Sequence, residues 1–196
     1  MRRVEPAPAL TYHARPDIGN GSDLLPSRIC HNQPVMHTEI TSSPDASGLR
    51  IGIAVSRYHG EITNRLLEGA KSFFLSHGGS EENLIIMRTP GAFELTVACR
   101  ALAEIDTIDA VIALGCVISG ETTHDQYINQ SIIQGLTTIT TTTGLPVAFG
   151  VLTCQTMKQA RVRAGGAKGN KGEEAMAAVI EMAITLQTLW ADEESS

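Results

Sequence analysis

The stretch AVIALGCVI at residues 110–118 decides the fold class, because it is apolar on both sides of the pleat that an extended strand would have. Three other short runs share this composition: 51–55, 84–87 and 147–152. Strands that are apolar on both faces are typical of a parallel sheet covered by helices on its two sides. The four runs therefore predict four core strands.

Longer amphipathic segments alternate with these runs. In residues 61–77 the apolar positions recur at steps of three and four, as on one helix face: Ile62, Leu66, Ala70, Phe73 and His77. The last segment has the same pattern, with a stripe of Ala175, Val179, Met182, Leu186 and Leu189. Residues 92–103 give a further helix. Residues 136–143 also read as a helix despite six threonines, because the segment stops at Gly144. This alternation predicts an α/β fold.

Size and charge narrow the class of protein. A chain of 196 residues with 42% hydrophobic residues is long enough for one domain with a substantial core. A formal net charge of -6 argues against a nucleic-acid partner, which requires a basic face. No apolar run approaches the roughly 18 residues needed to span a bilayer, and no signal peptide is evident, so we expect a cytoplasmic protein without a membrane partner.

The cysteines agree with a reducing compartment. Cys99, Cys116 and Cys154 lie in or beside apolar segments, and their separations match no zinc or C-x-x-C pattern. We interpret them as buried free thiols, and we expect no metal site.

The chain divides into three parts. Six of the eight prolines fall within residues 6–44, where no helical or strand period occurs, so residues 1–47 are expected to be a disordered N-terminal tail. Met36 is an alternative start of translation. A transit peptide is the other interpretation, disfavoured by the acids in this stretch. The folded domain is placed at 48–190, followed by an acidic C-terminal tail at 191–196.

Ligands of an open parallel sheet collect beyond the carboxyl ends of its strands, which directs attention to the turns there. In the turn at 119–124, Gly120 lets the backbone approach a ligand, and Thr122 and Thr123 open a helix whose free N–H groups would bind an anion. His124 would then lie beside a bound phosphate and could transfer protons. The alternative is a simple helix cap followed by a surface histidine.

Two other turns carry candidate residues. Tyr58 follows the first strand and could stack on a flat ring or be ordinary packing. Glu94 follows the second strand and could bind ligand hydroxyls or merely cap a helix. His77, on an apolar helix face, is more typical of a core histidine with its hydrogen bonds satisfied.

The glycine-rich segment 164–172 invites a nucleotide-binding interpretation, but it lacks the G-x-x-x-x-G-K-[ST] pattern of a P-loop, so ATP is not supported. We interpret it as a flexible loop on which Arg163, Lys168 and Lys171 could meet phosphate charge. A solvated basic loop is the alternative.

Six motifs together resemble the lumazine synthase family in order and spacing. They are GIAVSRY at 52–58, PGAFE at 90–94, ALGCVI at 113–118, GETTH at 120–124, FGVLT at 149–153 and GNKG at 169–172. The resemblance covers essentially all of residues 50–186. It implies a flavodoxin-like three-layer sandwich around a four-stranded parallel sheet. It also implies a homo-oligomer, namely a pentamer with active sites between subunits and possibly a 60-subunit shell.

The resemblance also implies a reaction. The family condenses 5-amino-6-(D-ribitylamino)uracil with 3,4-dihydroxy-2-butanone 4-phosphate to 6,7-dimethyl-8-ribityllumazine, releasing phosphate and water, in riboflavin biosynthesis. No cofactor is required, and a functional link with riboflavin synthase is expected. Two alternatives remain: a shell that binds flavin or lumazine without catalysis, and an unrelated phosphate-sugar enzyme on a similar sheet.

Roles follow at the matching positions. Tyr58 would stack on the pyrimidine, while Ala92, Phe93 and Glu94 would hold the ribityl chain. The backbone of Cys116, Val117 and Ile118 would read the ring edge, and Phe149 would close the pocket from the adjacent subunit. His124 would transfer protons. The phosphate would be bound by Glu121, Thr122, Arg163 and, as an accessory member, Lys171.

Four positions depart from the family pattern. His59 stands where asparagine is common, Ser119 where arginine is frequent, Asp125 where an aromatic is common and Gln126 where an acid is usual. At position 126 an uncharged amide replaces a carboxylate that could orient His124 and interact with its charge. Two interpretations stay open: the neighbouring Asp125 supplies that negative charge, or the site lacks it.

Overall fold

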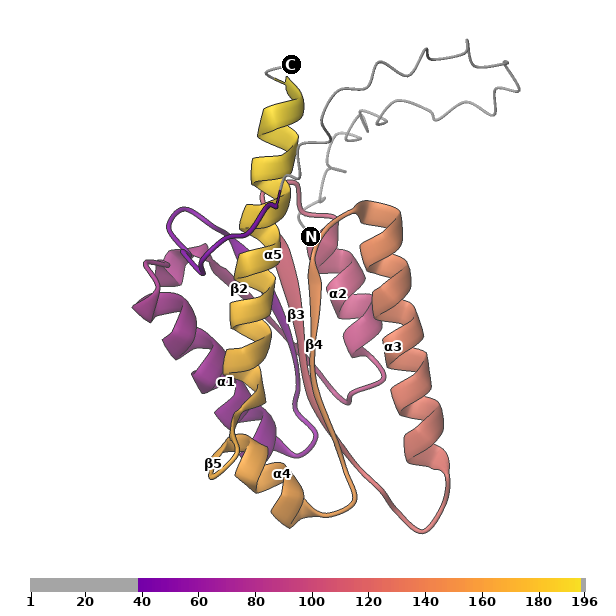
Figure 1. Ribbon diagram of the computed structural model, residues 1–196. Helices are drawn as coiled ribbons and strands as arrows, with labels where there is room; N and C mark the ends of the chain where they lie inside the picture. The colour runs from indigo at the N-terminus through magenta and orange to yellow at the C-terminus, as the bar shows by residue number, and fades with distance from the viewer. Residues whose placement is uncertain (1–38, 195–196) are drawn as a thin grey trace, which may run out of the picture. The chain divides into compact units, whose positions relative to one another are not determined.

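The computed structural model describes residues 39–194. The expectations for residues 1–38, including the alternative start at Met36, and for residues 195–196 lie outside the described residues. Four parallel strands form one sheet in the order β2-β1-β3-β4 (Figure 1). They are β1 (Ile51–Ser56), β2 (Leu84–Thr89), β3 (Ala110–Ile118) and β4 (Val147–Cys154). The four predicted strands are therefore confirmed.

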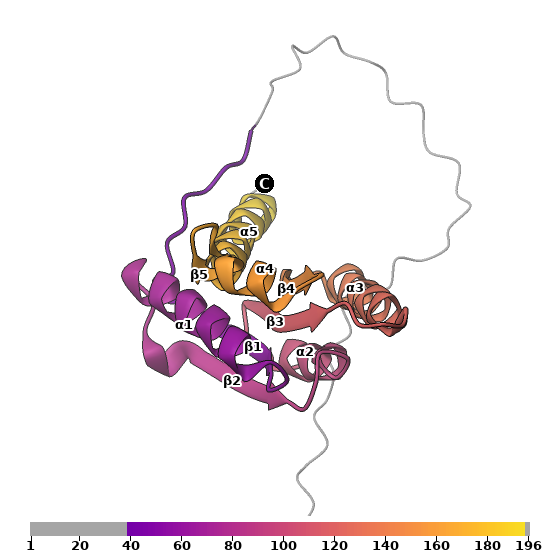
Figure 2. The same ribbon diagram turned by 90° about the horizontal axis from the view of Figure 1, so that it is seen from below.

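Helices cover both faces of the sheet, as the view along the layers shows (Figure 2). On one face lie α1 (Gly60–Ser76), α4 (Met157–Arg163) and α5 (Lys171–Glu194), and on the other α2 (Leu95–Ala103) and α3 (His124–Thr143). A short 3-10 helix, η1 (Glu81–Asn83), leads into β2. Two apolar cores result, one on each side of the sheet. This is the three-layer α/β sandwich, flavodoxin-like, that was predicted.

Helix α3 confirms the helical interpretation of 136–143 and extends it back to His124. Its threonines are accommodated because their hydroxyls donate to carbonyls one turn earlier, as Thr140 does to Leu136 at 3.1 Å and Thr143 to Ile139 at 2.7 Å. His77 is half-buried: its Nδ1 lies 2.8 Å from the carbonyl of Phe73 and its ring stacks on the Phe73 ring. The helical interpretation of 136–143 is confirmed. His77 has a hydrogen-bond partner as expected, but it lies at the end of α1 and not in the core.

Three details of the sequence prediction were wrong. Strand β2 is not buried on both sides, because it is an edge strand whose Ile86 and Met87 are exposed. Helix α2 begins at Leu95 rather than 92, because a turn occupies residues 91–94. On α5 the exposed Met182 and Leu189 are not part of the buried face, which is instead formed by Ala175, Met176, Val179, Ile180 and Ala183. The small alanines allow α5 to approach the sheet along this face.

The chain on the outer side of both expected domain limits, 48 and 190, is connected to the folded domain. Residues before 48 form hydrogen bonds with it, and residues after 190 continue its last helix. Ser42, placed in the tail, has its hydroxyl 2.9 Å from both the Glu181 carbonyl and the Thr185 hydroxyl on α5. The N–H of Ala46 donates to the carbonyl of His77 at 2.7 Å, and Ala46 is buried. At the other end α5 continues to Glu194. Within residues 39–194, no helix has the length and apolarity that crossing a bilayer would take.

Candidate active site

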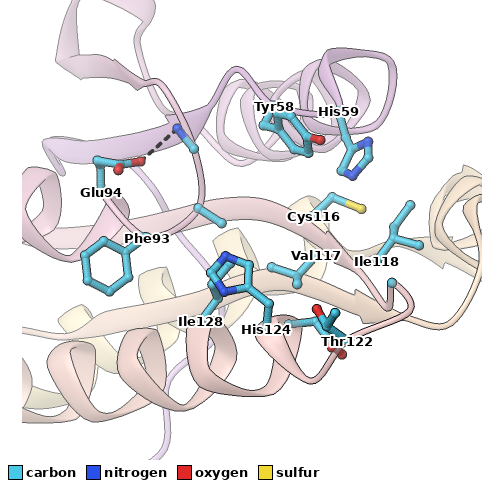
Figure 3. Close-up of a pocket in the computed structure, with 14 residues that line it drawn as sticks. Tyr58, His59, Phe93, Glu94, Cys116, Val117, Ile118, Thr122, His124 and Ile128 are labelled. Atoms are coloured by element: carbon cyan, nitrogen blue, oxygen red, sulfur yellow. Dashed lines mark hydrogen bonds between the residues drawn. The ribbon is translucent and has the colours of Figure 1, made fainter.

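A pocket of about 450 Å³ lies where β1, β2 and β3 end (Figure 3). We call it the central pocket. Three of the turns singled out in the sequence contribute to its wall, because the carboxyl ends of parallel strands meet at one edge of the sheet. The lining residues are Tyr58, His59, Gly91, Ala92, Phe93, Glu94, Cys116, Val117, Ile118, Gly120, Thr122, His124, Asp125 and Ile128.

Two aromatic rings at this pocket are largely exposed. Tyr58 has 66% of its surface accessible and Phe93 has 58%. A ring that serves ordinary core packing would be covered, so these exposures favour the ligand-stacking interpretation of Tyr58. The position of Tyr58 is fixed by the end of β1, where its N–H donates to the Ser56 hydroxyl at 3.2 Å.

Glu94 holds its own turn together. Its Oε2 accepts a hydrogen bond from the N–H of Gly91 at 2.9 Å, and the side chain makes no cap hydrogen bond to α2. Glu94 does stand at the N-cap position of α2, but only its backbone carbonyl bonds to the helix, accepting the N–H of Ala98 at 3.2 Å. The bond to Gly91 places the carboxylate in the wall of the central pocket, beside Ala92 and Phe93.

The turn before α3 brings His124 and Thr122 to the pocket. Helix α3 starts at His124, and its N-cap residue Thr123 makes no side-chain cap bond. The Ser119 hydroxyl donates to Asp125 Oδ2 at 2.8 Å and so closes the turn. Glu121 is exposed and is not among the lining residues, so the structure does not bring it to the pocket with Thr122.

Cys116 contributes a buried thiol to the wall of the central pocket. Burial, with a contribution from nearby Cys154, raises the pKa of the Cys116 thiol to about 12. The thiolate is then scarce at neutral pH. Cys99, Cys116 and Cys154 are all buried and free, as predicted.

A second pocket of about 400 Å³ contains the basic residues, and we call it the cationic pocket. It lies against β4, α4 and the start of α5. Its lining residues are Phe149, Val151, Leu152, Thr153, Cys154, Arg163, Lys168, Lys171 and Glu174. Lys171 Nζ contacts Glu174 Oε2 at 2.7 Å.

The glycine-rich segment 164–172 was predicted to be a flexible loop, and this prediction was wrong. The segment contains an antiparallel hairpin of β5 (Ala164–Gly166) and β6 (Gly169–Asn170). Asn170 attaches the hairpin to α1, because its Nδ2 donates to the carbonyl of Arg65 at 2.8 Å. Its Oδ1 accepts the N–H of Gly172 at 2.9 Å. These bonds hold the hairpin against α1 and the start of α5.

The predicted site residues are thus divided between two pockets. Among the described residues the pockets share no lining residue, and none that lines the central pocket is a lysine or arginine. Phe149, Arg163 and Lys171 lie in the cationic pocket, and the remainder except Glu121 lie in the central pocket.

Sequence reasoning assigned no role to several lining residues. His59 and Asp125 were noted only as departures from a family pattern. Ile128 stands one helical turn after His124, so helical spacing could have identified it. Within residues 39–194, no three His, Cys, Asp or Glu side chains gather as a metal site would require.

Fold and pocket together define a flavodoxin-like α/β protein with a small-molecule site at the carboxyl edge of its sheet. The model of the family described as 6,7-dimethyl-8-ribityllumazine synthase matches residues 48–187. The chain belongs to this family, as the sequence motifs predicted.

Individual relatives agree. A 6,7-dimethyl-8-ribityllumazine synthase of Parabacteroides distasonis is 44% identical over 150 residues, which are 76% of this chain and 94% of the relative. A protein of the same name from Porphyromonas gingivalis is 49% identical over 142 residues, covering 72% and 88% of the two chains.

Proposed function

We propose that the protein condenses 5-amino-6-(D-ribitylamino)uracil with 3,4-dihydroxy-2-butanone 4-phosphate to 6,7-dimethyl-8-ribityllumazine, as a transferase of riboflavin biosynthesis. Family membership supports the reaction. The observation that carries it in the structure is the central pocket, where the exposed Tyr58 ring, the Glu94 carboxylate and His124 line one cavity.

The ring substrate fits the central pocket. Tyr58 stacks on the pyrimidine, and the backbone of Cys116, Val117 and Ile118 at the end of β3 meets the ring edge. Ala92, Phe93 and Glu94 hold the ribityl chain, since a fixed carboxylate accepts hydrogen bonds from hydroxyl groups.

The phosphate substrate requires cations that the central pocket does not provide. Of the residues proposed to bind the phosphate substrate, the central pocket contains Thr122, with its hydroxyl, beside His124. Arg163 and Lys171 lie in the cationic pocket together with Phe149. Phosphate groups are bound most strongly by charge-assisted hydrogen bonds, especially from arginine. In a single chain, the residues proposed to bind the ring substrate and the cationic residues proposed to bind the phosphate therefore lie in two separate pockets.

We infer that the complete site forms between two copies, with the cationic pocket of one subunit facing the central pocket of its neighbour. Phe149 then closes the cavity from the adjacent subunit. Repetition of such a head-to-tail contact can close into a ring. The number of subunits, a pentamer that could associate further into a 60-subunit shell, is proposed from the family resemblance alone. Glu121, exposed beside Thr122, reaches the phosphate through its backbone N–H in this arrangement.

The chemistry proceeds without a cofactor. The amine of the uracil forms a Schiff base with the ketone and releases a first water, phosphate is then eliminated, and closure of the second ring releases a second water. Most of the acceleration comes from holding two reactive substrates together, where effective molarities can reach about 10⁵ M or more. His124 moves protons during these steps and contributes a smaller factor of about 10².

The buried free thiols support a reducing, cytoplasmic location, since such thiols persist there. The product is consumed by the next enzyme of the route, which supports a functional link with riboflavin synthase.

The test follows lumazine formation from the two substrates with wild type, His124→Ala, Arg163→Ala and a protein-free control. We expect wild type to exceed the control, His124→Ala to lower kcat and Arg163→Ala to raise the KM for the phosphate substrate. A wild type that only matches the control but binds lumazine or riboflavin would make the protein a non-catalytic binder.

A further inference from the structure

His59 has an unusual backbone conformation at the mouth of the central pocket. Its φ of 55° and ψ of 47° are left-handed, and it is the one non-glycine with positive φ among residues 39–194. Residues with a Cβ adopt this conformation at a cost that surrounding contacts must offset. Here the His59 carbonyl accepts the N–H groups of Ile62 and Thr63 at 2.8 and 3.1 Å, which begins α1.

The start of α1 explains the backbone but not the imidazole. The side chain of His59 makes no cap hydrogen bond to the helix. Glycine would adopt the same backbone at lower cost, and asparagine tolerates it as well as histidine does. The backbone conformation therefore does not by itself select an imidazole ring at this position.

The ring lies in the pocket wall against Tyr58. The two ring centroids are 4.5 Å apart and the planes are inclined by 64°, an edge-to-face arrangement (Figure 3). In that view His124 and Thr122 lie across the end of β3 from this pair. Tyr58 is otherwise two-thirds exposed, so the His59 ring limits the directions that the tyrosine ring can take.

We propose that His59 is a positioning residue for the ring substrate: its imidazole, inclined to the Tyr58 ring, holds that ring in the orientation in which it stacks on a planar heterocycle. The inference rests on the stacking role of Tyr58 proposed above. Burial lowers the pKa of His59, so at neutral pH the imidazole meets Tyr58 as an uncharged ring. Preorganisation of this kind strengthens binding, because less conformational freedom is lost when the ligand enters.

Two substitutions separate the ring from the backbone. His59→Gly and His59→Asn both accept the left-handed conformation, and both remove the aromatic contact. We expect each to weaken binding of 6,7-dimethyl-8-ribityllumazine, measured by fluorescence titration, by about threefold to tenfold. The KM for the uracil substrate should rise by the same factor, while the KM for the phosphate substrate stays at the wild-type value. A purely structural role would not divide the two KM values in this way.

A double-mutant cycle with Tyr58→Leu tests the mechanism. If His59 acts through Tyr58, removing His59 from the Tyr58→Leu variant should cost no further affinity. Additive losses, or wild-type affinity in both His59 variants while Tyr58→Leu binds weakly, would overturn the inference and leave the proposed function intact. Wild-type affinity in Tyr58→Leu itself would instead contradict the proposed ring site.

Discussion

The hydroxyl of Ser119 donates a hydrogen bond to Asp125 Oδ2 at 2.8 Å, across the turn that carries Thr122 and His124. From the sequence, both residues are expected departures from the family pattern, and the structure shows that their side chains are hydrogen-bonded to each other. The bond joins the end of β3 to the first turn of α3. It also engages a carboxylate oxygen of Asp125 with Ser119 rather than with His124.

Removal of this bond should loosen the turn. For Ser119→Ala we expect kcat to fall about threefold to tenfold, because the loss of one charge-assisted hydrogen bond lets His124 sample unproductive positions. Steady-state kinetics with both substrates measures the effect. Ser119→Thr keeps the hydroxyl and is the matched control, and equal kcat values for Ser119→Ala and wild type would show that the turn needs no such bond.

Gln126→Glu should change the pH dependence. The substitution adds a negative charge to the first turn of α3, two positions after His124, so we expect the kcat profile to shift toward higher pH relative to wild type. Profiles of kcat between pH 5 and 9 check this prediction. Superimposable profiles would mean that the charge at position 126 has no influence on the proposed proton transfer by His124.

Gly172 should resist substitution. A Cβ at this position would overlap the backbone carbonyl of Leu66, where α5 crosses α1. The obstacle is backbone, so the two helices would have to separate, and we expect Gly172→Ala to lower the free energy of unfolding by about 2–4 kcal/mol. Gly120→Ala is the control, because a Cβ there meets nothing within 4 Å. Urea unfolding compares the two, and similar midpoints would refute the tight crossing.

Acid should destabilise the fold through His59. Its pKa in the folded protein is lowered by burial from an ordinary value of 6.5. Well above pH 6.5 the group is neutral in both states, and as pH falls through 6.5 the unfolded chain takes up the proton first, so folding stability is lost. His59→Asn should therefore lose less stability between pH 7 and pH 5 than wild type. Urea unfolding at these pH values provides the comparison, and equal losses would argue against a desolvated imidazole.

The sequence predicted the sheet well because its signal is local. Runs such as 110–118 are apolar on both faces, and that property requires no knowledge of neighbours. The exposure of Ile86 and Met87 could not be predicted in the same way, because it depends on β2 being at the edge of the sheet. The composition of a single strand does not determine its position in the strand order.

The sequence predicted which residues belong to the site, but it did not predict that they are divided between two pockets. Motif order indicated which turns matter, and the central pocket gathers most of them. The separation of Arg163 from His124 depends on how α4 and the β5–β6 hairpin pack against β4, which is a tertiary property. The pairing of Ser119 with Asp125 and the left-handed backbone of His59 likewise needed coordinates.

We propose that each active site joins the central pocket of one subunit to the cationic pocket of another. Mixed oligomers of His124→Ala and Arg163→Ala, assembled by co-expression, test this arrangement most directly. If the halves come from different subunits, random mixing makes about a quarter of the sites fully wild type, and activity should return to about that fraction of the wild-type rate. Activity no higher than the mean of the two single variants would contradict the claim and place His124 and Arg163 in the same chain's site.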